Sequence, residues 1–122
     1  MILVDTSVWV QHLRAADRAL VTLLNVGQVL GHPFVVGELA LGNLKPRKIV
    51  LVSLQKLPQV TTSTDKEVLH FVDRYALYGT GIGYIDAHLL ASLRLTPGAV
   101  LWTRDKPLQL VTEKLGLAWD SS

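Results

Sequence analysis

The chain begins Met1-Ile2-Leu3-Val4-Asp5-Thr6-Ser7-Val8-Trp9, and this stretch decides the fold class. Residues 2–4 form a short apolar run, which is typical of a strand buried on both faces. Asp5, Thr6 and Ser7 then predict the start of a helix, because short oxygen-bearing side chains cap helix N-termini. A buried strand that passes straight into a helix indicates an α/β fold with a parallel sheet.

The rest of the chain contains more predicted helices than strands. Residues 99–102 predict a second apolar strand, which leads through Thr103-Arg104-Asp105 into a last helix, and short strands are expected at 28–30 and around Val60. Capping and opening residues predict further helices after Asp17, Pro33, Pro46, Thr64 and the glycine-rich loop 79–83. Helical spacing places Val8, Trp9, His12, Leu13, Leu20, Val21, Leu23 and Leu24 on inward faces. We predict one domain over residues 1–122, a three-layer α/β fold with a central, mostly parallel sheet flanked by helices.

The composition excludes several classes of protein. With 49% apolar residues in 122, the chain can bury one core, and disorder is excluded. The absence of cysteine excludes disulfides, cysteine-ligated zinc, iron–sulfur centres and a cysteine nucleophile. No apolar run reaches the length of a membrane span and no leader peptide is expected, so we expect a cytoplasmic protein with no membrane contact. A net charge of +2 permits polyanion binding, and the mean hydropathy of +0.33 suggests an apolar surface that another chain covers.

Two carboxylates follow the two clearest predicted strands. Asp5 and Asp105 both lie where an apolar run ends. Ligands of open parallel sheets bind beyond the carboxyl ends of the strands, so these two residues can share a site. Aspartate is also a favoured helix cap, and a helix is predicted after each residue. The local sequence leaves both interpretations open.

Two further acids lie among apolar residues on predicted helices. Glu38 and Asp86 have mostly apolar neighbours one helical turn away and no basic residue at that spacing. A buried carboxylate is costly unless it is paired, so we expect a cation to neutralise them. Mg²⁺ and Mn²⁺ prefer carboxylate and water oxygens, and such ions activate water for the cleavage of phosphodiesters. Four acids at one sheet edge therefore predict a metal-dependent site for a polyphosphate backbone.

Four short motifs resemble the PIN-domain ribonucleases, in particular the VapC-type toxins of toxin–antitoxin pairs. The motifs span nearly the whole chain and are Met1-Ile-Leu-Val-Asp5-Thr-Ser-Val-Trp9, Glu38-Leu-Ala-Leu-Gly42, Tyr84-Ile-Asp86-Ala-His-Leu-Leu-Ala91 and Leu101-Trp-Thr103-Arg-Asp105. The resemblance implies a Mg²⁺- or Mn²⁺-dependent endoribonuclease that acts on RNA, forms a homodimer and is inhibited by a cognate antitoxin. It implies that Asp5 and Asp86 are the principal metal ligands and that Glu38 and Asp105 complete the acidic pocket. It also implies supporting hydroxyls at Thr6 and Thr103.

Several other polar residues are candidates for RNA contacts or for structural roles. Arg14, Arg18, Arg104 and Lys106 lie near the acids in sequence and are our candidates for phosphate contacts, although ordinary surface charge explains them equally well. The segment Gly81-Ile-Gly83-Tyr84 departs from the family pattern. The departure affects the choice of substrate, because the neighbouring loop can line the path of the RNA. The histidines have no partner at metal-ligand spacing, so structural or surface roles are expected for them.

Three alternative functions remain open at this point. A phospho-receiver domain has a similar length and acids at strand ends, but residues 31–95 read as mostly helical rather than as alternating strands and helices. A catalytically inactive binding module is disfavoured because all four acids are present. A PIN-fold nuclease that processes RNA without an antitoxin has the same motifs, and a small upstream gene with a DNA-binding half would distinguish the two.

Overall fold

The computed structural model describes residues 1–120, and a three-stranded parallel sheet lies at its centre. The strands are β1 (Ile2–Val4), β2 (Val29–Leu30) and β3 (Val100–Trp102), in the order β2-β1-β3. Ile2 of the central strand lies opposite Val29 on one side and Val100 on the other. All three strands are parallel, so their carboxyl ends meet at one edge, as the apolar runs predicted.

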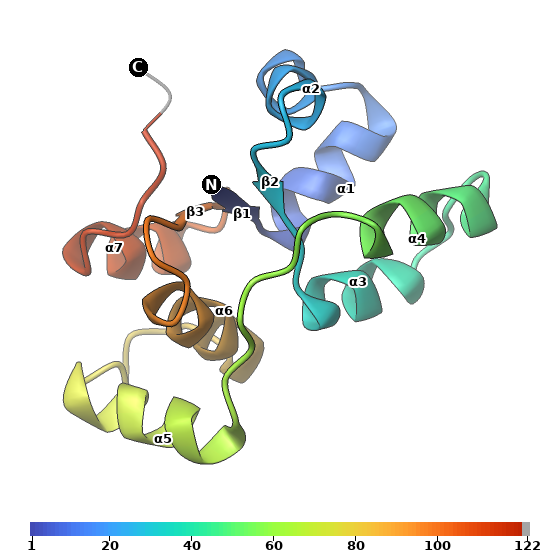
Figure 1. Ribbon diagram of the computed structural model, residues 1–122. Coiled ribbons are helices and arrows are strands. Elements are labelled where there is room, and N and C mark those ends of the chain that lie inside the picture. Colours follow the sequence, from blue (N-terminus) through green and yellow to red (C-terminus); the bar gives the residue numbers. More distant parts are fainter. Residues whose placement is uncertain (121–122) are drawn as a thin grey trace.

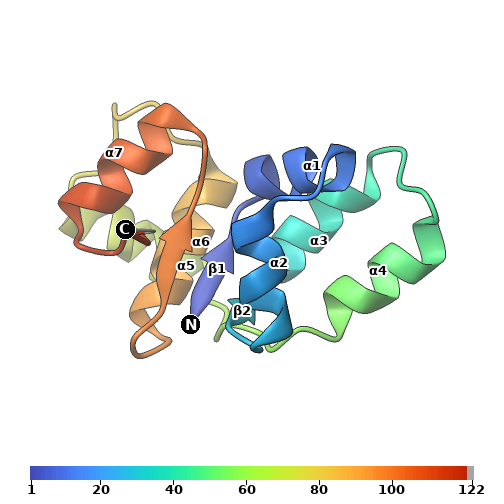
Figure 2. The ribbon, with the colours of Figure 1, turned by 90° about the horizontal axis from the view of Figure 1, so that it is seen from above.

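Helices cover the sheet on both sides and complete the three-layer α/β fold. Figures 1 and 2 show α1–α4 on one side of the strands and α5–α7 on the other. The helices are α1 (Thr6–Arg14), α2 (Arg18–Asn25), α3 (Pro33–Ala40), α4 (Arg47–Gln55), α5 (Asp65–Arg74), α6 (Tyr84–Arg94) and α7 (Lys106–Lys114). Four helices separate β2 from β3, which contradicts the regular alternation that a receiver domain requires.

The predicted caps explain where α2 and α5 begin. The Asp17 carboxylate accepts a hydrogen bond from the amide of Leu20, and Thr64 and Glu67 form a reciprocal capping box at the start of α5. Gly27 ends α2 with a φ of +68°, a left-handed conformation that favours glycine. Local side-chain chemistry is therefore sufficient to position these boundaries.

Four details of the sequence prediction are wrong. Val60 lies in no strand, and only an isolated bridge joins Gly31 to the neighbouring Gln59. Leu13 and Val21 are exposed, because the inward face of each short helix is narrower than the apolar stripe in its sequence. The strand β3 is buried only at its central residue, Leu101.

The core lies between the sheet and the helices on each side of it. Its fully buried side chains include Leu3, Leu20, Leu89, Leu90, Leu101 and Leu108. Two histidines, His32 and His88, are buried with them. Within residues 1–120 no helix has both the length and the apolar character needed to cross a membrane.

Candidate active site

Asp5 is the most buried of the four predicted acids, and its side chain does not cap a helix. Its backbone is the N-cap of α1, yet its carboxylate accepts no capping hydrogen bond. Instead Oδ2 accepts hydrogen bonds from the hydroxyls of Ser7 and Thr103, each at 2.8 Å. The side chain is turned into the protein, where the residue is only 6% exposed. The cap interpretation is therefore wrong for Asp5.

Asp105 is a helix cap, as the alternative interpretation predicted. Its Oδ2 accepts a hydrogen bond of 3.0 Å from the amide of Leu108 at the start of α7. Its own amide donates to the hydroxyl of Thr103, at 3.1 Å. Because the Thr103 hydroxyl also donates to Asp5, one side chain joins the two strand-end acids.

Glu38 lies on α3 and reaches α1 through a hydrogen bond. The hydroxyl of Thr6 donates to Glu38 Oε1 at 2.7 Å. The expected burial of Glu38 is wrong, because the side chain is exposed, as are its apolar neighbours Phe34 and Leu41. Apolar neighbours on the helix therefore did not mark a buried face here.

Asp86 is half-buried at the start of α6, where its Oδ2 accepts a hydrogen bond of 3.0 Å from the Gly83 amide. Its pKa is raised above the ordinary aspartate value, chiefly because burial disfavours the charged carboxylate. The negative charges of Asp5, Asp105 and Glu38 raise it further, while the Gly83 hydrogen bond opposes the shift. The other three acids therefore lie within electrostatic reach of Asp86.

None of these four acids forms a salt bridge within residues 1–120. Among residues 1–120, neither of the two ion pairs, His88–Asp65 and Arg104–Asp17, involves any of them. Carboxylates that repel one another and form no salt bridge are stabilised by a bound cation.

The donor set fits a hard divalent cation, although the side chains are not drawn tightly together. In the described part of the chain, no three carboxylate or imidazole groups are placed so that they could hold one ion directly. The donors are all carboxylate oxygens, and Mg²⁺ usually keeps several waters in its coordination shell. A cation held partly through water is compatible with this spacing.

The four predicted phosphate contacts differ in their surroundings. Arg104 pairs with Asp17 at 2.9 Å, and its guanidinium lies over the Trp102 ring, 5.8 Å from the centroid. Arg14 lines a cavity of about 320 Å³ together with Glu38. Arg18 and Lys106 are exposed at the first residues of α2 and α7, and no hydrogen bond or ion pair between residues 1–120 joins either side chain to an acid.

The sequence analysis missed two features close to the acids. The first is Ser7, which donates to Asp5 and accepts from the Arg104 amide. The only local signal was its place directly after Asp5 and Thr6.

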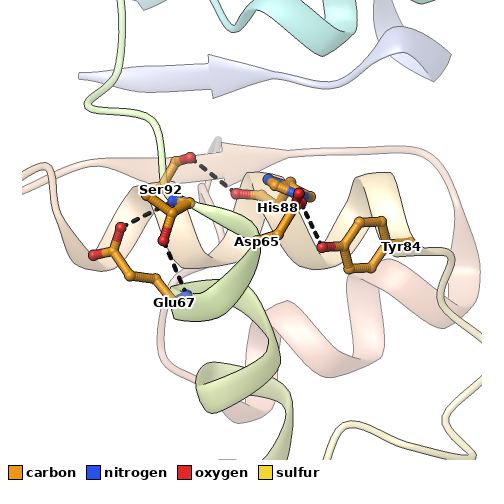
Figure 3. A network of polar contacts seen from close by, with 6 residues as sticks. Asp65, Glu67, Tyr84, His88 and Ser92 are labelled. Atoms are coloured by element: carbon orange, nitrogen blue, oxygen red, sulfur yellow. Dashed lines mark hydrogen bonds and ion pairs between the residues drawn. The ribbon is translucent and has the colours of Figure 1, made fainter.

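The second missed feature joins α5 to α6. Figure 3 shows Tyr84 and His88 of α6 directed towards Asp65 of α5. Asp65 Oδ1 accepts from the Tyr84 hydroxyl at 2.7 Å and lies 3.0 Å from His88 Nε2. Tyr84 and His88 lie two residues before and after Asp86, so this contact fixes the turn of α6 that carries the acid. The structural role expected for His88 agrees with this placement.

Comparison with known proteins agrees with the motifs. Two curated relatives are both named Ribonuclease VapC32, one from Mycobacterium tuberculosis strain CDC 1551 / Oshkosh and one from strain ATCC 25618 / H37Rv. Each is 52% identical to this chain over 118 residues, which cover 97% of this chain and 95% of the relative. Residues 2–114 match the family described as PIN domain. The resemblance read from the four motifs is thus confirmed, and the chain belongs to the PIN-domain family.

Proposed function

We propose that the chain is a metal-dependent endoribonuclease and the toxin component of a type II toxin–antitoxin pair. The observation that carries the proposal is the half-buried Asp86, whose pKa is raised chiefly by burial and further by the charges of Asp5, Asp105 and Glu38, while no salt bridge among residues 1–120 involves any of the four acids. The names of the two relatives, both called ribonucleases, support the same activity.

In this proposal Asp5 and Asp86 hold the metal, Mg²⁺ or Mn²⁺, and Glu38 and Asp105 complete the pocket. When bound, the metal supplies an activated water and charge stabilisation at the leaving oxygen of the phosphodiester. Glu38 and Asp105 orient the attacking water. The hydroxyls of Thr6 and Thr103 fix the carboxylates of Glu38 and Asp5 by the hydrogen bonds described above.

Arginine and lysine side chains near the pocket contact the RNA phosphates in this proposal. Arg14 is the best placed, because it lines the same cavity as Glu38. Arg18, Arg104 and Lys106 complete the set, and Arg104 must leave Asp17 to take part. Phosphate contacts position the strand without reading its sequence, so these residues contribute affinity more than selectivity.

We further propose that the chain acts as a single cytoplasmic domain, forms a homodimer and binds an antitoxin. Exposed apolar side chains support a protein partner, and Leu41 and Ile49, at 90% and 66% exposed, are among the clearest. A nearby apolar cavity of about 210 Å³ is lined by Trp9, Leu24 and Ile49, among others. Surfaces of this kind are typical of binding sites for other chains.

The test is cleavage of a panel of labelled single-stranded RNAs with Mg²⁺, Mn²⁺ or EDTA. We expect cleavage with either metal, none with EDTA, and a loss of about a thousandfold with Asp5→Asn or Asp86→Asn. Asp73→Asn is the matched control, because Asp73 is an exposed carboxylate on α5 and its substitution removes the same charge. A wild-type protein that cleaves no RNA, or Asn variants that cleave like the control, would contradict the proposal.

A nuclease that processes RNA without an antitoxin is separated from a toxin by a second measurement. Expression of the wild type in cells should arrest growth, and co-expression of the small protein encoded directly upstream should restore it. RNA cleavage in vitro together with unaffected growth would favour the processing role.

A further inference from the structure

Another cavity lies on the side of the molecule formed by α5 and α6. Its volume is about 480 Å³. Much of its wall is apolar and includes Phe71 and Ala91, which are buried, and Leu95. None of the four acids of the candidate active site lines it. It is therefore separate from the pocket described above.

Basic side chains surround this cavity. Lys66, His70 and Arg74 occur at every fourth residue of α5, so they lie along one face of the helix about 6 Å apart. Arg94, the last residue of α6, lines the cavity as well. No ion pair between residues 1–120 involves these side chains. The one carboxylate in the wall, Glu67, accepts a hydrogen bond from the Thr64 amide in the capping box.

Tyr75 holds two of these cations in place. The guanidinium carbons of Arg74 and Arg94 lie 5.7 and 5.0 Å from the centroid of its ring. Both distances fall within the range of cation–π attraction. Planar guanidinium groups and aromatic rings are the surfaces on which unpaired RNA bases stack. Ser63 also lines the cavity, and its buried hydroxyl has no hydrogen-bond partner among residues 1–120.

We propose that this cavity is a second contact site for single-stranded RNA, separate from the acidic pocket. Phosphates follow the row of Lys66, His70 and Arg74, and a base enters the cavity beside Tyr75. An acidic peptide would satisfy the charges but would make no use of stacked planar groups, so the observations favour RNA. The inference rests on the proposed ribonuclease function, because that function supplies the RNA.

The position of the cavity suits a strand that is also held by the acids. Asp86 lies in the first turn of α6 and Arg94 is the last residue of the same helix. Eight residues of helix separate them by about 12 Å along its axis. One RNA strand can therefore contact both ends of α6, and the second site would hold nucleotides that flank the cleaved bond.

The test measures binding without cleavage. A short fluorescent 2′-O-methyl RNA is titrated in EDTA with wild type and with Lys66→Gln/Arg74→Gln. Two lost phosphate contacts should weaken binding about tenfold and lower the slope of log K against log salt by about 1.4. The matched control, Lys48→Gln/Lys56→Gln, removes two exposed charges from the region of α4 and should change the affinity less than twofold. Tyr75→Leu keeps an apolar side chain but removes the ring, and should also weaken binding.

Each remaining outcome either supports or overturns the inference. Equal weakening by both double variants would show general charge attraction and overturn it. Competition by poly-glutamate as strong as by RNA of equal charge would identify an acidic protein as the occupant. If the Lys66→Gln/Arg74→Gln variant differs from the wild type in oligomeric mass but not in RNA affinity, the occupant is a second copy of the chain. This result and strong competition by poly-glutamate would each overturn the inference.

Failure of the inference is distinguishable from failure of the proposed function. Wild-type protein that binds RNA through Lys66 and Arg74 but cleaves nothing with metal would leave this site standing and contradict the nuclease proposal. If the wild type cleaves RNA and the Lys66→Gln/Arg74→Gln variant binds RNA as tightly as the wild type does, the nuclease proposal stands and the second contact site is contradicted. Thermal unfolding of each variant checks that the substituted proteins are folded.

Discussion

The turns that follow β1 and β3 each place an aspartate at the N-cap position of the next helix, yet the two carboxylates make different hydrogen bonds. Each turn has an aspartate between an apolar strand and a helix. Asp105 caps α7, whereas Asp5 leaves α1 uncapped and accepts hydrogen bonds from Ser7 and Thr103. The difference shows that an aspartate at a helix start does not cap the helix when nearby hydroxyls donate to its carboxylate instead. Such a carboxylate is turned away from the helix amides and can take part in a binding site.

The turn after β2 gives a third result. Here His32 is the N-cap of α3, and its Nδ1 accepts a hydrogen bond of 3.0 Å from the Phe34 amide. The other ring nitrogen is buried and has no hydrogen-bond partner among residues 1–120. Three parallel strands thus lead into three helices through an inward carboxylate, a capping carboxylate and a capping imidazole.

The largest expected effect separates Asp5 from Asp105 in catalysis. Asp5→Asn keeps the hydrogen-bond acceptor but removes a charge, and cleavage should fall on the order of a thousandfold. Asp105→Asn keeps the cap and should lower cleavage by only about tenfold. Initial rates on one RNA, with both proteins checked by thermal unfolding, provide the measurement. Equal losses of cleavage rate in Asp5→Asn and Asp105→Asn would mean that the two acids have the same role in catalysis. That result would contradict the proposed difference between Asp5 and Asp105.

The next effect concerns the turn after β2 and acid stability. Burial, and to a smaller extent the charge of His88, lowers the pKa of His32 from 6.5 to about 4. The unfolded chain takes up a proton below pH 6.5 while the folded imidazole stays neutral. Stability that is fully present above pH 6.5 is therefore lost as the pH falls towards 4, by about 3 kcal/mol in all.

His32→Asn tests this expectation, because Asn also caps helices and does not titrate. Urea unfolding across this pH range should show the wild type losing stability relative to the variant. The variant lacks the ring packed against Phe34, so its stability at pH 7 should be lower. Parallel stability curves for the two proteins would contradict the assignment of the acid sensitivity to His32.

A smaller effect should follow when the link between the β1 and β3 turns is cut. Thr103→Val removes the hydroxyl that donates to Asp5 and accepts from the Asp105 amide, while keeping the shape of the side chain. Loss of a hydrogen bond that orients a metal ligand typically costs 10- to 100-fold in activity or metal affinity, so we expect a loss of about that size. Thr112→Val is the control, because the Thr112 hydroxyl is also buried but bonds only to its own helix. Cleavage equal to that of the control would show that Thr103 does not position Asp5.

The smallest effect isolates capping from catalysis. Asp105→Ala removes the cap of α7 and should lower the free energy of unfolding by about 1 kcal/mol, whereas Asp105→Asn should be nearly neutral. Chemical denaturation of both variants measures the difference. If the Ala and Asn variants prove equally stable, the hydrogen bond to Leu108 contributes little and Asp105 resembles Asp5 more than the structure suggests.

Much of the fold was predictable because its determinants are local. The apolar runs at β1 and β3, the Thr64–Glu67 capping box and the Asp17 cap each involve residues a few positions apart. At these boundaries the capping hydrogen bonds join neighbouring residues and formed as the side-chain types predicted. The prediction failed at Val60 and at Leu13, where packing against distant elements determined the result.

The sequence nominates the residues of the candidate site but does not predict their surroundings. Four acids in family order are the predicted carboxylates of the site, yet helical neighbours predicted a buried Glu38 that is in fact exposed. An amphipathic pattern predicts which face of a helix is apolar. Whether that face is buried depends on the elements that pack against the helix, and these come from other parts of the chain.

The sequence by itself determined most of the helices and strands and the PIN-domain family, because apolar runs, caps and short motifs involve neighbouring residues. Only the tertiary structure decided which aspartate caps a helix and which does not. Thr103 donates to Asp5 from 98 positions away, and His88 approaches Asp65 from 23 positions away. Such pairs depend on how strands and helices pack, and no local pattern contains that information.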